Sequence, residues 1–156
     1  MKNNHTLIIG GGIVGATLAL KLAQHKMPVT LVDARPTRDE SAWQQMLGKR
    51  DARVYALSLA SINLLEDIGA WQHITASKRK ADYSQMQVWQ LNGMGELLFG
   101  DSHDQSAAPE ILGSMVEPAV IEHALWRRLH EADVSDYLTV IAGHKVVNMD
   151  WLGAQQ

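Results

Sequence analysis

The sequence contains no cysteine among its 156 residues. A disulfide framework, a cysteine zinc site and a thiol nucleophile are therefore excluded, and a reducing compartment fits this composition. The seven histidines form no HExxH or other ligand pattern, so we expect no metal site.

The sequence also lacks an excess of either charge and any long apolar run. Fourteen basic and seventeen acidic residues give a net charge of −3, which does not favour a nucleic-acid partner. Apolar runs are interrupted well before the ~18 residues of a membrane span, and the first residues do not resemble a signal peptide. We expect a cytoplasmic protein, with peripheral membrane contact left open and the oligomeric state not indicated.

Glycine is concentrated near the start, in the stretch TLIIGGGIVGATLALKLAQHKMPVTLVDA, residues 6–34. Residues 7–9 are β-prone, residues 13–24 have helical periodicity, with Val14, Leu18 and Leu22 in one apolar stripe, and residues 29–32 form a second apolar run. Strand, glycine turn, helix and strand within about 30 residues predict a βαβ unit with parallel strands.

The turn itself reads GxGxxG, with glycine at Gly10, Gly12 and Gly15. In a dinucleotide-binding turn, the first glycine permits the tight bend, the second admits a diphosphate and the third allows close packing of helix on strand. Backbone N–H groups at the helix start, around Ile13 and Val14, would bind the phosphates. The alternative is a glycine-rich turn with no ligand.

Asp33 stands at the end of the second strand, followed by Ala34 and Arg35. A carboxylate at this place can accept hydrogen bonds from an adenosine ribose, which favours FAD or NAD over NADP. Arg35 and Arg38 weaken that preference slightly, because arginines can accommodate a 2′-phosphate.

The remaining pattern predicts an α/β fold in which a Rossmann-like FAD-binding βαβ domain is interleaved with part of a β-rich substrate domain. Asn92-Gly93 indicates a hairpin turn between two strands. We assign residues 1–80 to the FAD-binding part, 81–112 to a substrate-domain hairpin and 113–156 to the returning FAD-binding domain. The predicted elements are a polar loop with at most one helical turn at 35–50, helices at 56–68 and 120–131, and strands at 83–91, 96–99, 112–116, 138–141 and 146–151.

Two longer motifs carry a family resemblance. DARVYALSLASINLLEDIGAW (51–71) and LGSMVEPAVIEHALWRRL (112–129), together with QVWQ at 87–90, resemble the ubiquinone-biosynthesis hydroxylases. These are FAD-dependent aromatic monooxygenases related to p-hydroxybenzoate hydroxylase. The resemblance covers most of the chain to about residue 130, and the motifs are more specific than the glycines.

The resemblance implies further cofactor contacts. Arg53 matches an arginine placed near the FAD phosphates and ribityl chain, and Glu117 matches a polar residue that approaches the ribityl chain. The alternatives are a surface ion pair between Arg53 and Asp51, and a helix N-terminal acid at Glu117. Pro118 and Lys26 depart from the family pattern, where asparagine and glycine are usual. No catalytic residue is indicated.

The resemblance also implies the chemistry. NAD(P)H would reduce the flavin, and O₂ would then give a C4a-hydroperoxide that hydroxylates an aromatic ring. The implied substrate is a polyprenylated phenol, and association with a membrane or a biosynthetic complex is compatible with it. Family members are about twice as long and carry later Asp-Gly and Gly-Asp motifs, so we expect an N-terminal part that is inactive alone and binds FAD weakly. The alternatives are an NAD-dependent dehydrogenase domain and a non-catalytic nucleotide-binding module.

Overall fold

The computed structural model describes residues 5–91, 93, 95–100, 110–134 and 136–150. The chain forms two compact units, Met1–Met46 with Leu125–Gln156, and Leu47–Ala124. The predicted divisions at residues 80 and 112 do not coincide with these units, because residues 47–80 and 113–124 belong with the hairpin region. The assignment of FAD and substrate binding to separate domains stays a prediction.

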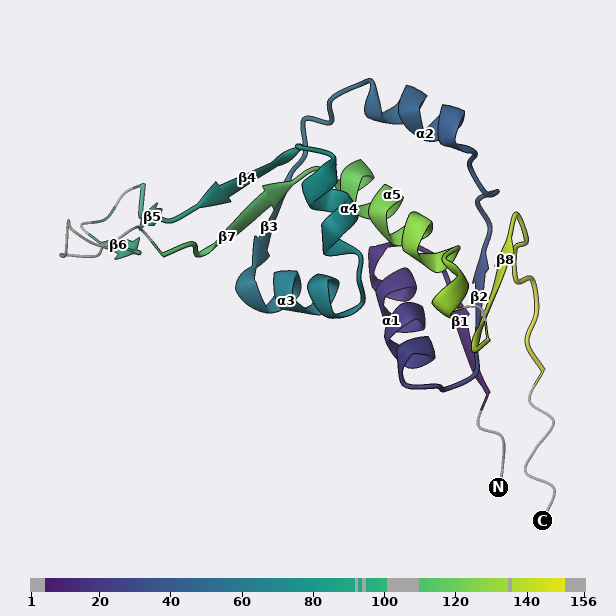
Figure 1. Ribbon diagram of the computed structural model, residues 1–156. Helices are drawn as coiled ribbons and strands as arrows, with labels where there is room; N and C mark the ends of the chain where they lie inside the picture. Colours follow the sequence, from purple (N-terminus) through teal and green to yellow (C-terminus); the bar gives the residue numbers. More distant parts are fainter. Residues whose placement is uncertain (1–4, 92, 94, 101–109, 135, 151–156) are drawn as a thin grey trace, which may run out of the picture. The chain divides into compact units, whose positions relative to one another are not determined.

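The first unit is built on a three-stranded parallel sheet, which confirms the predicted α/β class (Figure 1). Strand β1 (Thr6–Ile9) leads through the glycine turn into helix α1 (Ile13–Gln24), and strand β2 (Val29–Asp33) returns beside β1. Strand β8 (Leu138–Ala142) pairs with the other edge of β2, opposite Val29–Asp33. The carboxyl ends of β1 and β2 therefore meet at the glycine turn.

Helix α1 packs through small side chains. Ala16, Ala19 and Ala23 are buried, so the helix backbone lies close to the sheet. Val14 is 82% exposed and Leu18 is also exposed, so these two members of the predicted apolar stripe are not buried. Lys26, where the family pattern has glycine, adopts a φ of 58° in the left-handed region that glycine favours.

The polar segment after β2 contains more helix than predicted. Helix α2 spans Glu40–Leu47. The side chain of Asp39 accepts a hydrogen bond from the Ala42 N–H at 2.7 Å, which caps the first turn, and Trp43 is buried on the inner face. A cap and a buried apolar side chain thus support a helix in a segment whose composition resembles a loop.

The second unit contains a three-stranded antiparallel sheet in the order β3-β7-β4. The predicted helix over 56–68 is wrong at its start, because residues Tyr55–Ser58 form strand β3 and helix α3 (Leu59–Asp67) begins only after Ser58. The Ser58 hydroxyl accepts from the Ser61 N–H and so fixes this boundary. The other elements are β4 (Lys80–Tyr83), β7 (Gly113–Val116) and helix α4 (Trp71–Ala76).

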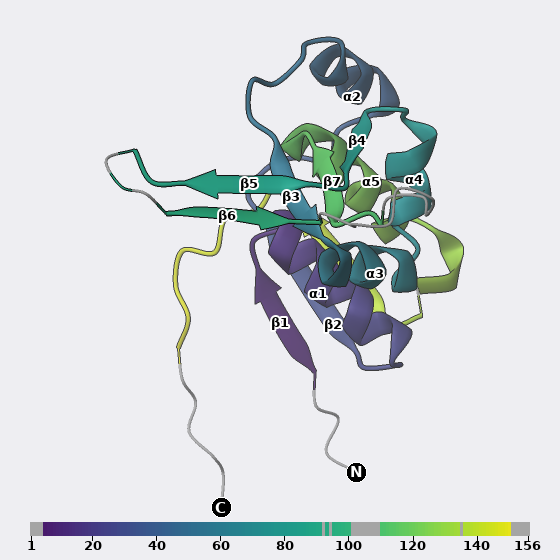
Figure 2. The same ribbon diagram turned by 90° about the vertical axis from the view of Figure 1, so that its left-hand side faces the viewer.

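The hairpin is confirmed. Strands β5 (Met86–Trp89) and β6 (Glu96–Phe99) pair antiparallel (Figure 2). Asn92 of the predicted turn lies outside the described residues. Helix α5 spans Pro118–Leu129 and is followed by the 3-10 helix η1 (Ala132–Val134). The predicted strand at 146–151 is wrong for residues 146–150, which form no strand, and Trp151 lies outside the described residues.

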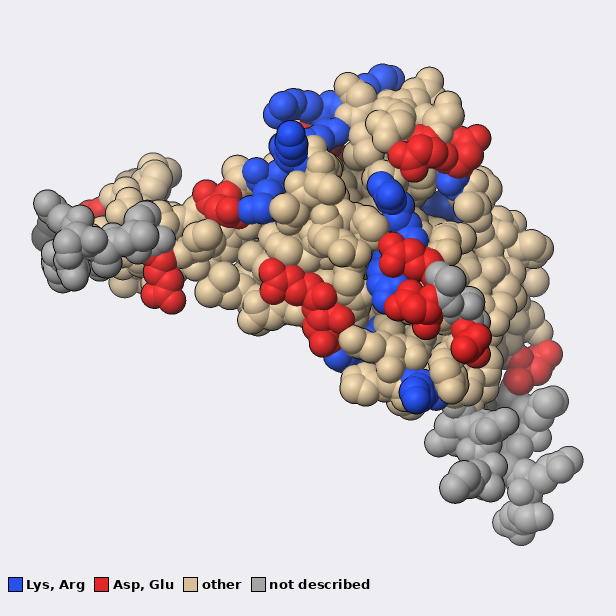
Figure 3. Space-filling view, in the orientation of Figure 1, with Lys and Arg blue, Asp and Glu red and all other residues tan. Residues whose placement is uncertain are grey.

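Charge and apolarity on the surface agree with the composition. Both acidic and basic side chains occur on the face drawn in Figure 3, where most of the surface carries neither. Within the described ranges, no helix has the length and apolarity that a bilayer crossing requires.

Candidate cofactor-binding site

The glycine turn joins β1 to α1 in the geometry that the sequence predicts. Gly10 has a φ of +104°, and its N–H donates to the Val32 carbonyl at 2.8 Å, so the turn continues from the sheet. A Cβ at Gly15 would lie 1.9 Å from the Gly10 carbonyl oxygen, which requires glycine there. A Cβ at Gly12 would meet nothing within 4 Å. The turn therefore has no room for a side chain at Gly15 and has open space at Gly12.

Open space at Gly12 coincides with the start of α1. Gly12 is the N-cap, with no side-chain cap, and its carbonyl accepts from the Ala16 N–H at 2.9 Å. The N–H groups of the first helical turn, including those of Ile13 and Val14, have no carbonyl one turn earlier to bind. Ile13 is half-buried, whereas Val14 is exposed. This end of the helix can accept an anion at its backbone.

Asp33 is 5% exposed and lies against the turn. Its Oδ2 accepts from the Gly11 N–H at 2.5 Å, and its Oδ1 accepts from the Arg35 N–H at 2.7 Å. Burial by itself would raise the pKa of Asp33, but hydrogen bonds from Arg35 and Gly11 outweigh it and hold the pKa below its ordinary value. Asp33 is consequently ionised at neutral pH and can act only as an acceptor.

The guanidinium of Arg35 covers the same carboxylate. Its Nε donates to Asp33 Oδ1 at 3.1 Å and its Nη2 to Oδ2 at 3.3 Å, the two longest of the four bonds. A carboxylate has about four lone-pair positions, so a ribose hydroxyl would have to displace the Arg35 side chain. Ala34, which lies between Asp33 and Arg35 in the sequence, is exposed.

The second unit places Arg53 in an exposed ion pair. The Arg53 side chain is 76% exposed, and its Nη2 donates to Asp51 Oδ2 at 2.8 Å. The Arg53 N–H also donates to Asp51 Oδ1, which closes a short loop. The structure thus shows the alternative contact that the sequence left open, while a cofactor contact of Arg53 stays a prediction.

Glu117 is buried in a network of three protein donors. Arg79 donates to it through Nε at 3.1 Å and Nη2 at 2.6 Å, and the Asp51 N–H donates to Oε2 at 2.9 Å. The hydrogen bonds from Arg79 lower the pKa of Glu117. Arg79 also donates through Nη1 to the Leu47 carbonyl. Glu117 therefore ties the Asp51–Arg53 loop to Arg79, and its predicted ribityl contact stays a prediction.

Eight of the ten predicted site residues come together in the first unit, and Arg53 and Glu117 lie in the second. Sequence reasoning missed two residues that form hydrogen bonds here. Trp126 binds the glycine turn, and Arg79 binds Glu117. Trp126 belongs to the ALW motif that carried the family resemblance, whereas Arg79 stands in a basic KRK triplet that reads as surface.

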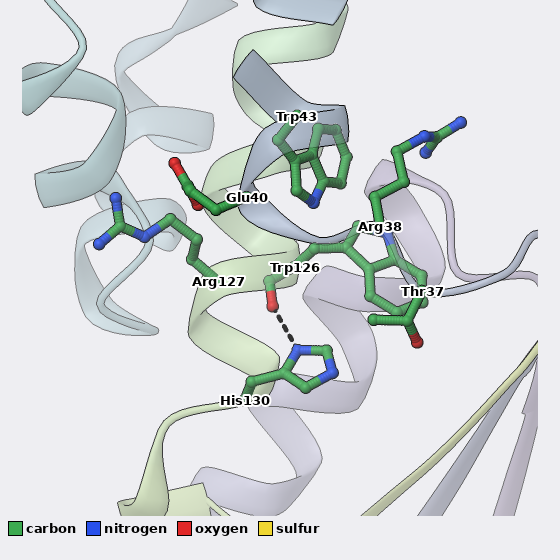
Figure 4. A pocket seen from close by; sticks show the side chains of 7 residues that line it. All are labelled: Thr37, Arg38, Glu40, Trp43, Trp126, Arg127 and His130. Atoms are coloured by element: carbon green, nitrogen blue, oxygen red, sulfur yellow. Dashed lines mark hydrogen bonds between the residues drawn. The ribbon is translucent and has the colours of Figure 1, made fainter. Parts of the chain in front are cut away.

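Trp126 reaches the glycine turn from α5. Its Nε1–H donates to the Gly11 carbonyl at 3.1 Å in a buried bond. The same indole forms part of a pocket of about 190 Å³ in the first unit, with Trp43, Arg38 and His130 (Figure 4). His130 stacks on Trp126 with ring centroids 5.9 Å apart, and its Nδ1 bonds the Trp126 carbonyl at 2.7 Å.

Comparison with known proteins identifies related sequences. The family model described as FAD dependent oxidoreductase matches residues 5–97. The chain is 35% identical over 126 residues to 3-demethoxyubiquinol 3-hydroxylase of Escherichia coli (strain K12), covering 78% of this chain and 29% of that protein. It is 31% identical over 150 residues to the mitochondrial ubiquinone biosynthesis monooxygenase COQ6 of Homo sapiens, covering 93% of this chain and 30% of that protein. The chain thus spans less than a third of the length of these relatives.

Solved structures share the fold. p-Nitrophenol 4-monooxygenase PnpA from Pseudomonas putida DLL-E4 superposes with a TM-score of 0.59 at 17% identity, over 94% of this chain and 33% of that one. The tetrameric form of 2-methyl-3-hydroxypyridine-5-carboxylic acid oxygenase gives 0.60 at 15% identity, over 96% and 34%. At these identities the likeness concerns the fold alone.

Proposed function

Because the chain belongs to the FAD dependent oxidoreductase family, we propose that it is the FAD-binding part of an aromatic-ring hydroxylase of ubiquinone biosynthesis. The names of the E. coli and human relatives support the reaction class and the pathway. The observation that carries the proposal is the glycine turn, which is open at Gly12 and lies beside the ionised Asp33.

The residues of the first unit fit the adenosine diphosphate half of FAD. Backbone N–H groups at the start of α1 would bind the diphosphate, with Gly12 leaving room for its approach. Asp33 would accept from the ribose hydroxyls once the Arg35 guanidinium swings aside. That guanidinium, about one-third exposed, has space to move.

From the family resemblance, we also propose that Arg53 and Glu117 serve cofactor binding. Arg53, exposed and held by Asp51, offers a guanidinium that forks well onto phosphate oxygens. Glu117 would act through the loop that it fixes at the Asp51 N–H. Both assignments are part of the proposal.

When bound, the flavin supplies the transfer of oxygen from O₂ to an electron-rich ring, with NAD(P)H as reductant. The chain's own residues bind and orient the cofactor. The proposed substrate is a polyprenylated phenol, a proposal that rests on the motif resemblance and is supported by the ubiquinol and ubiquinone in the relatives' names. A cytoplasmic location and association with a membrane or biosynthetic complex remain predictions from the sequence.

One other function has a specific observation in its favour. A non-catalytic nucleotide-binding module would need only the first unit's turn, which is open at Gly12. An NAD-dependent dehydrogenase domain is less compatible, because an antiparallel hairpin and sheet follow the first βαβ unit where further βα units are expected.

A titration with FAD, followed by flavin fluorescence, separates the proposed function from an NAD-dependent dehydrogenase. We expect the chain to bind FAD weakly and to prefer it to NAD. NAD(P)H oxidation with a phenolic acceptor should be absent for this chain and present for the E. coli relative measured alongside. Preference for NAD would support the dehydrogenase, and failure to bind any adenine nucleotide would refute the proposal.

A further inference from the structure

Both backbone polar groups of Gly11 are bound by side chains from other elements. Its N–H donates to Asp33 Oδ2 at 2.5 Å, and its carbonyl accepts from Trp126 Nε1 at 3.1 Å. Asp33 ends β2 and Trp126 lies on α5, 115 residues further along the chain than Gly11. Both side chains are buried, with Trp126 6% exposed.

The fit around Gly11 leaves no room for a side chain. A Cβ there would lie 2.9 Å from Asp33 Oδ2 and 2.9 Å from Trp126 Cζ2. The Asp33 and Trp126 side chains therefore both pack closely against Gly11. Gly12, one residue later, has open space instead.

Peptide planarity transmits the tryptophan's hydrogen bond to Gly12. In a trans peptide, the carbonyl of one residue and the N–H of the next lie in one plane and point in opposite directions. Since Trp126 binds the Gly11 carbonyl, the Gly12 N–H must point away from the indole. The bond thus fixes the direction of an amide at the N-cap of α1, where the diphosphate is proposed to bind.

The indole is itself fixed in place. His130 stacks on it and bonds the Trp126 carbonyl one helical turn earlier (Figure 4). Trp43 lines the same pocket, is equally buried, and has the Arg38 guanidinium over its ring. Trp43 is consequently a matched control for the loss of a buried indole.

We propose that Trp126 is a positioning residue for diphosphate recognition, which orients the Gly11–Gly12 peptide through its indole N–H. This inference rests on the proposed function, because it assigns the open side of the turn to the cofactor's diphosphate. It adds a residue of α5 to a site that the glycine motif places between β1 and α1.

The test compares ADP with adenosine as ligands of the Trp126→Phe variant, by calorimetry or NMR titration. Phenylalanine keeps an aromatic ring in the packing but lacks the donor and is smaller than the indole, a loss of volume that Trp43→Phe shares. We expect about fivefold weaker ADP binding, the effect of one buried hydrogen bond, and unchanged adenosine binding. Trp43→Phe should leave both affinities unchanged. Equal weakening for the two ligands, or no weakening of ADP, would overturn the inference.

A second measurement needs no variant of the turn. In the wild-type chain the Trp126 indole N–H resonance should exchange slowly with solvent and shift when ADP is added, while that of Trp43 stays in place. An unshifted Trp126 resonance at saturating ADP would also overturn the inference. If the wild-type chain fails to bind ADP at all, the proposed function fails; if it binds and Trp126→Phe matches it, only this inference fails.

Discussion

The glycine turn of the first unit and the Asp51–Arg53 loop of the second both set a carboxylate against a backbone N–H, but they differ in burial. Asp33 is enclosed by the turn that it binds, whereas Asp51 holds an arginine that is mostly in solvent. The conformation of the turn thus depends on contacts that cannot change unless the backbone moves. The loop instead depends on the buried pair of Glu117 and Arg79 behind it.

Gly15→Ala should have the largest effect, because its Cβ would meet the Gly10 carbonyl oxygen at 1.9 Å. Moving backbone to relieve this contact should cost about 3 kcal/mol of unfolding free energy. Urea denaturation measures it. Gly12→Ala is the matched control, and a loss there of no more than about 1 kcal/mol is expected from its N-cap position. Equal losses of unfolding free energy in the two variants would mean that the turn has room for a side chain at Gly15, contrary to the structure.

Arg79→Met tests the support of the second region. Removing the guanidinium leaves Glu117 buried without its main donor, and we expect a loss of about 2 kcal/mol, since Arg79 keeps some exposure. The same denaturation experiment applies. Arg128→Met offers a comparison, because its carboxylate partner Asp133 is largely exposed and the loss should be smaller. A larger stability loss for Arg128→Met than for Arg79→Met would contradict the stabilising role assigned to the Arg79–Glu117 pair.

Acid should weaken the same pair. The native pKa of Glu117 is lowered, so its contribution to stability is complete above the ordinary glutamate pKa of about 4.3 and is lost as pH falls through the lower native pKa. The urea midpoint of the wild-type chain should therefore fall below pH 4.3. Glu117→Gln should flatten this dependence, whereas a parallel fall in the variant would assign it to other carboxylates.

Arg53→Ala should have the smallest effect on stability, because exposed ion pairs contribute little. The thermal midpoint is expected to match that of the wild-type chain. Under the proposed function, FAD affinity should nevertheless fall, which a flavin fluorescence titration would measure. A lowered midpoint with unchanged affinity would make the pair structural only.

The difference between local and long-range contacts explains how much of the fold and site could be predicted from the sequence. Gly10, Gly12 and Gly15 are spaced by the geometry of one turn, so local sequence was sufficient for β1, α1 and β2. The support given by Trp126 and Arg79 was not predictable, because each acts on a residue far along the chain. At 56–58, pairing with β7 overrode a helical pattern, a tertiary effect that periodicity does not record.

ADP binding to Gly12→Ala tests the central claim most directly. A methyl group at Gly12 meets no protein atom within 4 Å, so the variant should fold as the wild type does. It would stand where the diphosphate approaches, and we expect ADP affinity to fall at least tenfold while adenosine affinity is retained. Wild-type ADP affinity in a folded Gly12→Ala variant would contradict the account.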